Sequence, residues 1–193
     1  MRRSFLRVEV SLMRVSTPSK PRPALLLDRD GTLTADEGYT FRVEDLRWLS
    51  GAQEAIVAAQ QRGALVILIT NQSGIGRGYF TEADMDAFHA AMQADLAALG
   101  ARLDAIYYCP FIAEAADPRF RVADHPDRKP NPGMLLRAIA EHGIDPATSL
   151  MVGDQDSDVT AAERAGVSGL KTTGGRLDDA IAPWLAGLPA QRR

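Results

Sequence analysis

Short apolar runs alternate with longer helix-type stretches along most of the chain. Runs typical of buried strands lie at residues 24–27, 64–69, 103–108, 150–152 and 169–172. Stretches with helix start and stop signals lie at residues 51–62, 81–99, 132–143, 156–165 and 177–185. Strands that alternate with helices predict an α/β fold with a parallel sheet, and continuously apolar strands predict that helices cover both of its faces. We therefore expect a doubly wound parallel sheet.

Residues near the predicted helix starts agree with these boundaries. Ser50 and Gln53 fit a capping box before the helix at 51–62. Thr81 is expected to begin the next long helix. The stretch 109–131 contains four prolines and is expected to be irregular.

The composition is that of an ordinary globular chain. Of 193 residues, 46% are hydrophobic and 24% are charged, which is enough for one domain with a sizeable core. The chain has no apolar run of about 18 residues, so we expect no membrane span. The single cysteine, Cys109, excludes an internal disulfide and fits a reducing compartment. We therefore expect a cytoplasmic protein, and we expect it to be a monomer.

Charge is distributed unevenly along the chain. The net charge is −3, yet residues 1–22 carry six basic side chains and one acidic side chain. The remainder of the chain is therefore acidic, which is not expected of a protein that binds nucleic acid. We interpret residues 1–23 as a disordered basic leader and residues 24–190 as one folded domain. A targeting or surface-binding arm is the alternative for the leader.

Two acidic residues directly follow the first predicted strand. Asp28 and Asp30 flank Arg29, and Gly31 and Thr32 come next. In an extended segment, residues two positions apart point the same way, so both carboxylates can face one reacting centre. Taken alone, this stretch also fits a solvated turn, because Asp and Gly are common turn residues.

Three further polar groups follow strands or precede a helix. They are Thr70, Asn71, Gln72 and Ser73 after the second strand, Arg128 and Lys129 before the helix near Pro132, and Asp154 and Asp158 after the fourth strand. Amides, hydroxyls and cations of this kind can hold phosphate oxygens, and the acids can hold Mg²⁺. Each group also has a simpler reading as a loop, a solvated pair or a helix cap. Their joint position is the stronger evidence, because ligands bind at the carboxyl ends of such strands.

At these residues the chain resembles the haloacid dehalogenase superfamily of phosphatases. The similar stretches are LLLDRDGT (25–32), DEGY (36–39), ITNQSGIGRGYFTE (69–82), IYYCP (106–110), DRKPNPGM (127–134) and MVGDQDSD (151–158). Within the superfamily they are most similar to the D-glycero-D-manno-heptose 1,7-bisphosphate phosphatases and the related histidinol-phosphate phosphatases. The resemblance spans roughly residues 24–175 and implies a Rossmann-like fold.

The resemblance implies a role for each matching residue. Asp28 is expected to attack phosphorus and become an aspartyl-phosphate, and Asp30 is expected to act as the acid and then as the base. Thr70 and Lys129 complete the implied catalytic residues. The implied magnesium ligands are Asp28, the carbonyl of Asp30, Asp154, and Asp158 through water. The implied substrate contacts are Asp36, Tyr39, Asn71, Gln72, Ser73, Arg77 and Arg128.

Two positions depart from the family pattern. Members with a structural zinc carry a C-x-H and a C-x-C pattern, and the corresponding positions here are Cys109, Phe111, His125 and Asp127. Phe111 cannot bind a metal, and structural zinc prefers four nitrogen or sulfur ligands, so we expect no structural zinc. The second departure is Gln155, where a lysine often follows the metal-binding acid. It weakens an exact assignment of the substrate.

The spacing of the motifs leaves no room for a separate cap domain. Between Asp28 and Thr70, and between Asn71 and Arg128, there is space only for loops, one helix and one strand. We expect a site that is open apart from three loops, at 34–45, 72–80 and 110–127. An open site suits a small phosphorylated metabolite.

Three functions compete at this stage. The leading hypothesis is a Mg²⁺-dependent phosphatase acting on a heptose bisphosphate. The second is a phosphatase with another small substrate, such as histidinol phosphate. The third is a phospho-accepting signalling domain, since these domains also carry acids at strand ends. Asp30 and the Arg128-Lys129 pair argue against the third.

Overall fold

A computed structural model describes residues 21–188 of the chain, and these residues contain one parallel sheet of five strands. The strands are β1 (Ala24–Leu27), β2 (Leu65–Asn71), β3 (Ala105–Cys109), β4 (Leu150–Gly153) and β5 (Ser168–Lys171). Their order is β3-β2-β1-β4-β5, and every neighbouring pair is parallel. The expected α/β fold is confirmed. The leader predicted at 1–23 falls almost wholly outside the described residues.

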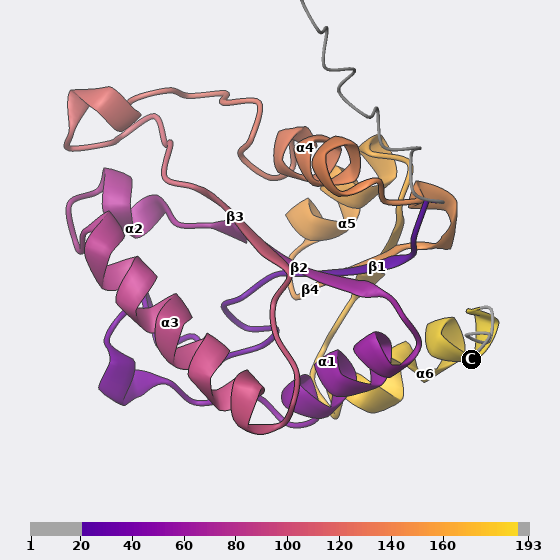
Figure 1. The fold of residues 1–193 in the computed structure, drawn as a ribbon. Helices are drawn as coiled ribbons and strands as arrows, with labels where there is room; N and C mark the ends of the chain where they lie inside the picture. Colours follow the sequence, from indigo (N-terminus) through magenta and orange to yellow (C-terminus); the bar gives the residue numbers. More distant parts are fainter. Residues whose placement is uncertain (1–20, 189–193) are drawn as a thin grey trace, which may run out of the picture.

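Helices cover both faces of the sheet (Figure 1). On one face lie α1 (Ala52–Gln61), α3 (Glu82–Ala98) and α6 (Leu177–Gly187), and on the other lie α4 (Gly133–His142) and α5 (Asp156–Arg164). Alternate residues of β1 face the two layers, because side chains along a strand point to opposite sides. Leu25 and Leu27 pack with the first group of helices, and Ala24 and Leu26 pack with the second.

Four short helical segments interrupt regions that we expected to be loops. They are α2 (Ser73–Gly76) and the 3₁₀ helices η1 (Val43–Asp45), η2 (Pro118–Phe120) and η3 (Pro146–Thr148). The predicted capping box of Ser50 is wrong. Gly51, with φ 77°, occupies the N-cap position of α1, and no side chain caps it. The carbonyl of Ser50 instead accepts the Leu177 N–H at the start of α6.

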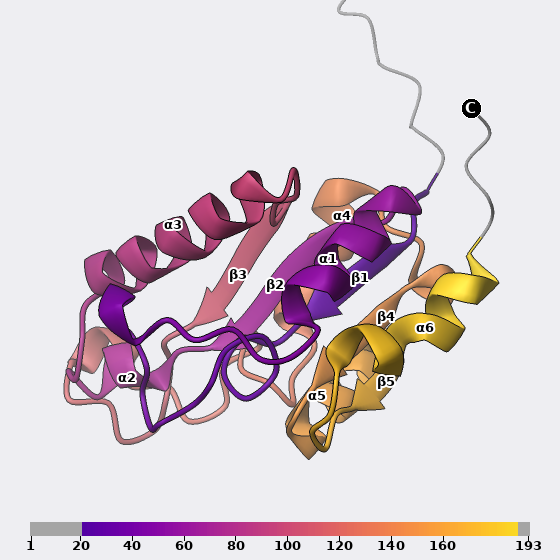
Figure 2. The same ribbon diagram turned by 90° about the horizontal axis from the view of Figure 1, so that it is seen from below.

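The long connections of the chain gather at the carboxyl edge of the sheet (Figure 2). Parallel strands all end at the same edge, so the loops after β1, β2, β3 and β4 come together there. The described residues contain no cap domain beside the sheet and its helices, as expected. The connection after β3 packs on α2, where the Ala116 N–H donates to the Gly76 carbonyl at 2.8 Å. Among the described residues, no helix is both long enough and apolar enough to span a bilayer.

Candidate active site

A cavity of about 300 Å³ lies at the carboxyl edge of the sheet, within the range of small-ligand sites. Ten of the residues predicted for the site line it. They are Asp28, Asp30, Asp36, Tyr39, Asn71, Gln72, Ser73, Lys129, Asp154 and Asp158. Residues from four separate segments of the chain thus meet at one cavity, as the alternation of strands and helices predicted.

A buried lysine joins two of the acidic residues of the cavity. Lys129 Nζ lies 2.8 Å from Asp28 Oδ1, 2.6 Å from Asp158 Oδ1 and 2.7 Å from the Ile69 carbonyl oxygen. Only 4% of Lys129 is exposed. Burial alone would lower the pKa of Lys129, but the two carboxylates outweigh it and raise that pKa above its ordinary value. Lys129 therefore carries a positive charge inside the cavity.

Asp158 contributes to this arrangement through both of its oxygens. Oδ1 pairs with Lys129, and Oδ2 accepts the Gln155 backbone N–H at 3.0 Å, at the start of α5. Burial raises the pKa of Asp158, and the attraction of Lys129 opposes that rise. Asp158 thus links the helix that follows β4 to the lysine that precedes α4.

Three carboxylates of the cavity form a cluster that can hold a cation. Oxygens of Asp28, Asp154 and Asp158 lie within 4.8 Å of one another. Asp154 Oδ2 accepts a hydrogen bond from the Gln155 side chain, but Asp154 Oδ1 is buried without a hydrogen-bond partner among the described residues. A buried oxygen without a donor is costly unless a cation or water pairs with it. These oxygen donors fit a divalent cation such as Mg²⁺.

Gly31 allows the loop after β1 to approach this cluster. Its φ of 77° lies in the left-handed region, which glycine adopts without strain. A Cβ atom at this position would lie 2.6 Å from Asp154 Oδ2. A side chain there would displace the Asp154 carboxylate, so glycine is required for the close approach of the two loops.

Asp30 is held by a network of hydrogen bonds. Arg29 Nε donates to Asp30 Oδ1 at 2.8 Å, and Arg29 Nη2 donates to Oδ2 at 2.9 Å. Gln72 Nε2 donates to the same Oδ2 at 2.9 Å and to Thr70 Oγ1 at 2.8 Å. Burial raises the pKa of Asp30 above its ordinary value, although Arg29 and Gln72 act in the opposite direction. A raised pKa favours the protonated form that a general acid needs.

Asn71 holds the backbone on which Lys129 is carried. Asn71 Nδ2 donates to the Lys129 carbonyl at 3.1 Å, and Asn71 Oδ1 accepts the Lys129 N–H at 3.1 Å. This reciprocal pair connects the end of β2 to the segment before α4. The amide predicted to bind phosphate thus also positions the lysine of the site.

One tyrosine lines the cavity from the loop after β1, and a second tyrosine packs against it. Tyr39 lines the cavity, and its ring meets that of Tyr79 edge to face at a centroid distance of 4.8 Å. Tyr39 has a φ of 63°, which is uncommon for a residue other than glycine. The backbone before it turns because Asp36 Oδ1 accepts the Gly38 N–H at 2.8 Å.

Three residues predicted for the site do not line the cavity. The Thr70 hydroxyl is buried behind Gln72. Arg77 lies 3.8 Å from Glu114, and Arg128 Nη1 donates to the Phe111 carbonyl at 3.1 Å. The loop 110–127, which was expected to flank the site, contributes no residue to the cavity. It supports α2 instead.

The sequence analysis missed several residues that the structure brings to the site. Gly38, Gly74, Gln155 and Ser157 line the cavity. Arg29 donates hydrogen bonds to the Asp30 carboxylate and is 0% exposed. The only signal for Arg29 was its place between two candidate acids, directly after a buried strand. Arginine is almost never fully buried unless it is paired, so residue type argued against such a role.

The positions at which the family resemblance implies a structural zinc in some members make other contacts here. The His125 ring stacks on Phe111 at a centroid distance of 3.8 Å, and His125 Nδ1 accepts the Asp127 N–H at 3.1 Å. Asp127 also lies 3.3 Å from Arg137. Cys109 is buried, and burial raises the pKa of its thiol, which disfavours the thiolate that binds metal. The contacts of His125 and Asp127 with protein groups support the expectation that no structural zinc is bound here.

Comparisons with known proteins show the family to which the chain is related. A family model described as HAD-hydrolase-like matches residues 127–184. The chain is 44% identical over 144 residues to D-glycero-alpha-D-manno-heptose-1,7-bisphosphate 7-phosphatase of Burkholderia mallei, covering 75% of this chain and 76% of that protein. It is 42% identical over 164 residues to D-glycero-beta-D-manno-heptose-1,7-bisphosphate 7-phosphatase of Rhodopseudomonas palustris, covering 84% and 90%.

A solved structure extends the likeness to the fold. The D,D-heptose 1,7-bisphosphate phosphatase of B. bronchiseptica, complexed with magnesium and phosphate, has a TM-score of 0.70 and 32% identity. The match covers 86% of this chain and 88% of that protein. By sequence and fold, this chain is a phosphoric monoester hydrolase that belongs to the heptose-bisphosphate phosphatase family of HAD-like hydrolases.

Proposed function

We propose that this phosphatase removes the 7-phosphate of D-glycero-D-manno-heptose 1,7-bisphosphate through an aspartyl-phosphate on Asp28. The position of Asp28 is the main support for this mechanism. Asp28 Oδ1 lies 2.8 Å from Nζ of the buried Lys129, and Asp28 belongs to the acidic cluster. The relatives support the choice of substrate, because they are named for this reaction and align over three quarters or more of this chain.

We infer that the carboxylates of Asp28 and Asp154 and the backbone carbonyl of Asp30 would hold a magnesium ion. The unpartnered Asp154 Oδ1 supports this assignment, since it offers a buried negative oxygen with no donor among the described residues. Bound there, the ion supplies positive charge that lowers the repulsion between a carboxylate nucleophile and a dianionic phosphate.

The reaction takes place in two displacements at phosphorus, in which Asp28, Asp30 and Lys129 have separate roles. A carboxylate oxygen of Asp28 attacks phosphorus, and the bond from phosphorus to the sugar oxygen breaks as Asp30 donates its proton to that oxygen. In the second displacement Asp30 takes a proton from water, which attacks phosphorus and releases inorganic phosphate and the Asp28 carboxylate. Lys129 stabilises the charge on the phosphoryl oxygens in both steps.

The sugar would be bound by residues that line the cavity, and the second phosphate by a residue outside that lining. Asp36, Tyr39 and Ser73 line the cavity and are our candidates for sugar contacts. Arg128 remains a candidate for the second phosphate, because within residues 21–188 its guanidinium makes one side-chain hydrogen bond, to the Phe111 carbonyl, and its other donors can serve a phosphate. We expect Arg128→Ala to lower kcat/KM for the bisphosphate about 10-fold or more, and to lower it less for a monophosphate.

A substrate panel tests the proposed function. Both anomers of the heptose bisphosphate, histidinol phosphate and 4-nitrophenyl phosphate are assayed with Mg²⁺, and kcat/KM is compared. We expect one heptose anomer to be the best substrate. A higher value for histidinol phosphate would overturn the heptose assignment, and a phospho-protein that persists without turnover would indicate a signalling domain.

Asp28→Asn is the matched variant for the nucleophile. It is nearly isosteric, so the fold should persist while turnover is lost. Retention of more than about a tenth of wild-type kcat, which is only about 1.4 kcal/mol of barrier, would contradict the role of Asp28.

A further inference from the structure

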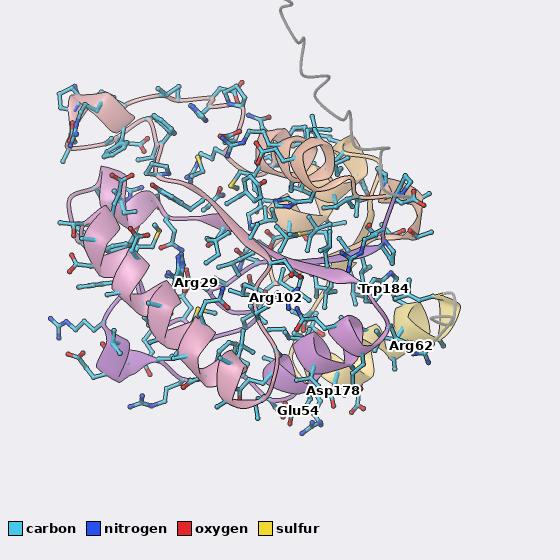
Figure 3. All side chains as sticks on the ribbon, in the orientation of Figure 1. Arg29, Glu54, Arg62, Arg102, Asp178 and Trp184 are labelled. Atoms are coloured by element: carbon cyan, nitrogen blue, oxygen red, sulfur yellow. The ribbon has the colours of Figure 1, made fainter. Side chains whose placement is uncertain are left out.

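We propose that Arg29 is a positioning residue for Asp30, and that α3 holds Arg29 in place through His89 and Phe88. Arg29 would act only through the Asp30 carboxylate and would not touch substrate. This inference rests on the proposed function, in which Asp30 transfers the protons. It assigns a task to a buried arginine that lies beside α3 in Figure 3 and does not line the cavity.

The guanidinium of Arg29 is fixed from several directions. It donates to both oxygens of Asp30, at 2.8 and 2.9 Å. Nη2 also donates to the Thr40 carbonyl at 2.7 Å, and Nη1 lies 3.3 Å from His89 Nε2. The Phe88 ring covers its carbon at 4.8 Å from the ring centroid. A side chain held at this many points has little freedom to change its rotamer.

The paired contact with Arg29 determines where the Asp30 carboxylate points. A fork of two parallel N–H···O bonds fixes the plane of a carboxylate as well as its position. Gln72 adds a third donor from the end of β2. Proton transfer requires the donor atom within hydrogen-bond reach of the leaving oxygen, and a misplacement of about 1 Å can cost about 10²-fold in rate. Arg29 thus restrains the group whose placement matters most for proton transfer.

His89 connects this restraint to α3. Its ring is 4% exposed, and burial together with the adjacent Arg29 charge lowers its pKa to about 3. At neutral pH the imidazole is therefore uncharged, and its Nε2 can accept the N–H of Arg29. An imidazolium in this place would repel the guanidinium. His89 is thus a neutral acceptor for the one side of Arg29 that faces away from Asp30.

A purely structural role for Arg29 makes a different prediction. Through the Thr40 carbonyl, Arg29 also ties down the loop after β1, so its loss could disturb the whole cavity. In that case, removing Arg29 would lower activity whether or not Asp30 is present. If Arg29 acts through Asp30, its removal should matter little once Asp30 can no longer transfer a proton. A double-mutant cycle separates the two.

The experiment measures kcat/KM for Arg29→Met, Asp30→Asn and the double variant, with Mg²⁺ present. The substrates are phenyl phosphate, whose phenolate leaves poorly, and 4-nitrophenyl phosphate, whose nitrophenolate leaves readily. We expect Arg29→Met to lower the value about 10–10²-fold for phenyl phosphate and much less for the nitrophenyl ester. The double variant should fall within about threefold of Asp30→Asn. A further drop of 10-fold or more, or equal losses with both substrates, would overturn the proposal.

Variants of His89 test the same proposal if Arg29→Met does not fold. His89→Leu removes the acceptor for Arg29 and should show the same leaving-group signature, with a loss of about 3–10-fold for phenyl phosphate. His89→Gln retains an acceptor and should restore most of the activity. Leu96→Ala is the control, because it weakens the packing of α3 without touching Arg29. Equal behaviour of His89→Leu and His89→Gln would contradict the proposal.

The two levels of inference fail separately. If Asp30→Asn has near wild-type activity, the proposed role of Asp30 fails, and the role of Arg29 falls with it. If Asp30→Asn is impaired, but the losses from Arg29→Met and Asp30→Asn add up in the double variant, only the positioning role of Arg29 is refuted.

Discussion

The buried His89 makes the stability of the fold depend on pH in a way that one substitution can isolate. In the folded protein its pKa is lowered to about 3, first by burial and then by the Arg29 charge, from an ordinary value of 6.5. His89→Gln keeps a hydrogen-bond acceptor near Arg29 but cannot titrate. The variant therefore removes the proton linkage while preserving the contact.

The direction of the effect follows from where each state binds the proton. Below pH 6.5 the unfolded chain protonates this imidazole, whereas the folded protein does not until the pH is near 3. Folding is thus unaffected by His89 above pH 6.5 and becomes less favourable as the pH falls. One pH unit corresponds to about 1.4 kcal/mol, so at pH 5 the wild type should have lost about 2 kcal/mol through this residue.

Urea unfolding at pH 7 and pH 5 measures this loss. Other groups that titrate, including the remaining histidines His125 and His142, are common to both proteins and cancel in the comparison. The free energy of unfolding of the wild type should therefore fall by about 2 kcal/mol more than that of His89→Gln. A difference below about 0.5 kcal/mol would refute the reasoning, because it would mean that His89 is protonated in the folded protein as easily as in the unfolded chain.

Asp30→Asn should lower kcat/KM for phenyl phosphate by about 10²–10⁴-fold, the usual reach of acid–base catalysis, and the nitrophenyl ester should suffer less. Equal losses would contradict the acid role. Mg²⁺ at about 100 times its Kd should raise Tm by about 5–10 °C in calorimetry, and Asp154→Asn should abolish most of that rise. If Asp154→Asn showed the same rise in Tm, Asp154 would not be a ligand of the metal. Protein purified without added zinc should contain well under one equivalent by metal analysis, whereas stoichiometric zinc would show that His125 and Asp127 serve as ligands.

The sheet and the position of the site are predictable because both depend on local patterns. The run 24–27 is apolar at every position, which indicates a strand buried on both faces, and all four residues are fully buried. The polarity changes abruptly at Asp28, where the strand has ended. Because parallel strands end at one edge, the polar residues after β1, β2 and β4 had to meet.

Arg29 could not be predicted in this way, because its environment is made by distant residues. Its partners Phe88 and His89 lie about 60 positions along the chain, on the face of α3 that packs against the sheet. Residue type alone places arginine at the surface. Only the folded chain shows that the Arg29 side chain is fully buried and pairs with Asp30, Thr40 and His89.

Asn71 and α2 show two further limits of the sequence pattern. A polar residue at the end of a strand can serve a ligand or the protein backbone, and the amide of Asn71 pairs with Lys129. The stretch Ser73–Gly76 contains two glycines and indicates a loop, yet it forms a short helix. It is held from outside by the loop 110–127, whose contacts lie too far along the chain to be recognised.

The charges of the site explain why its two principal acids have different partners. Asp28 is paired with Lys129, which comes from a distant segment and is shared with Asp158. Asp30 is paired with Arg29, which faces away from the cavity toward α3. The ammonium therefore lies at the cavity, whereas the guanidinium holds Asp30 from the side of α3. With the acids ionised, Asp28, Asp154 and Asp158 still exceed Lys129 by two negative charges. A divalent cation would offset that excess and so reduce the repulsion that a dianionic phosphate meets at the site.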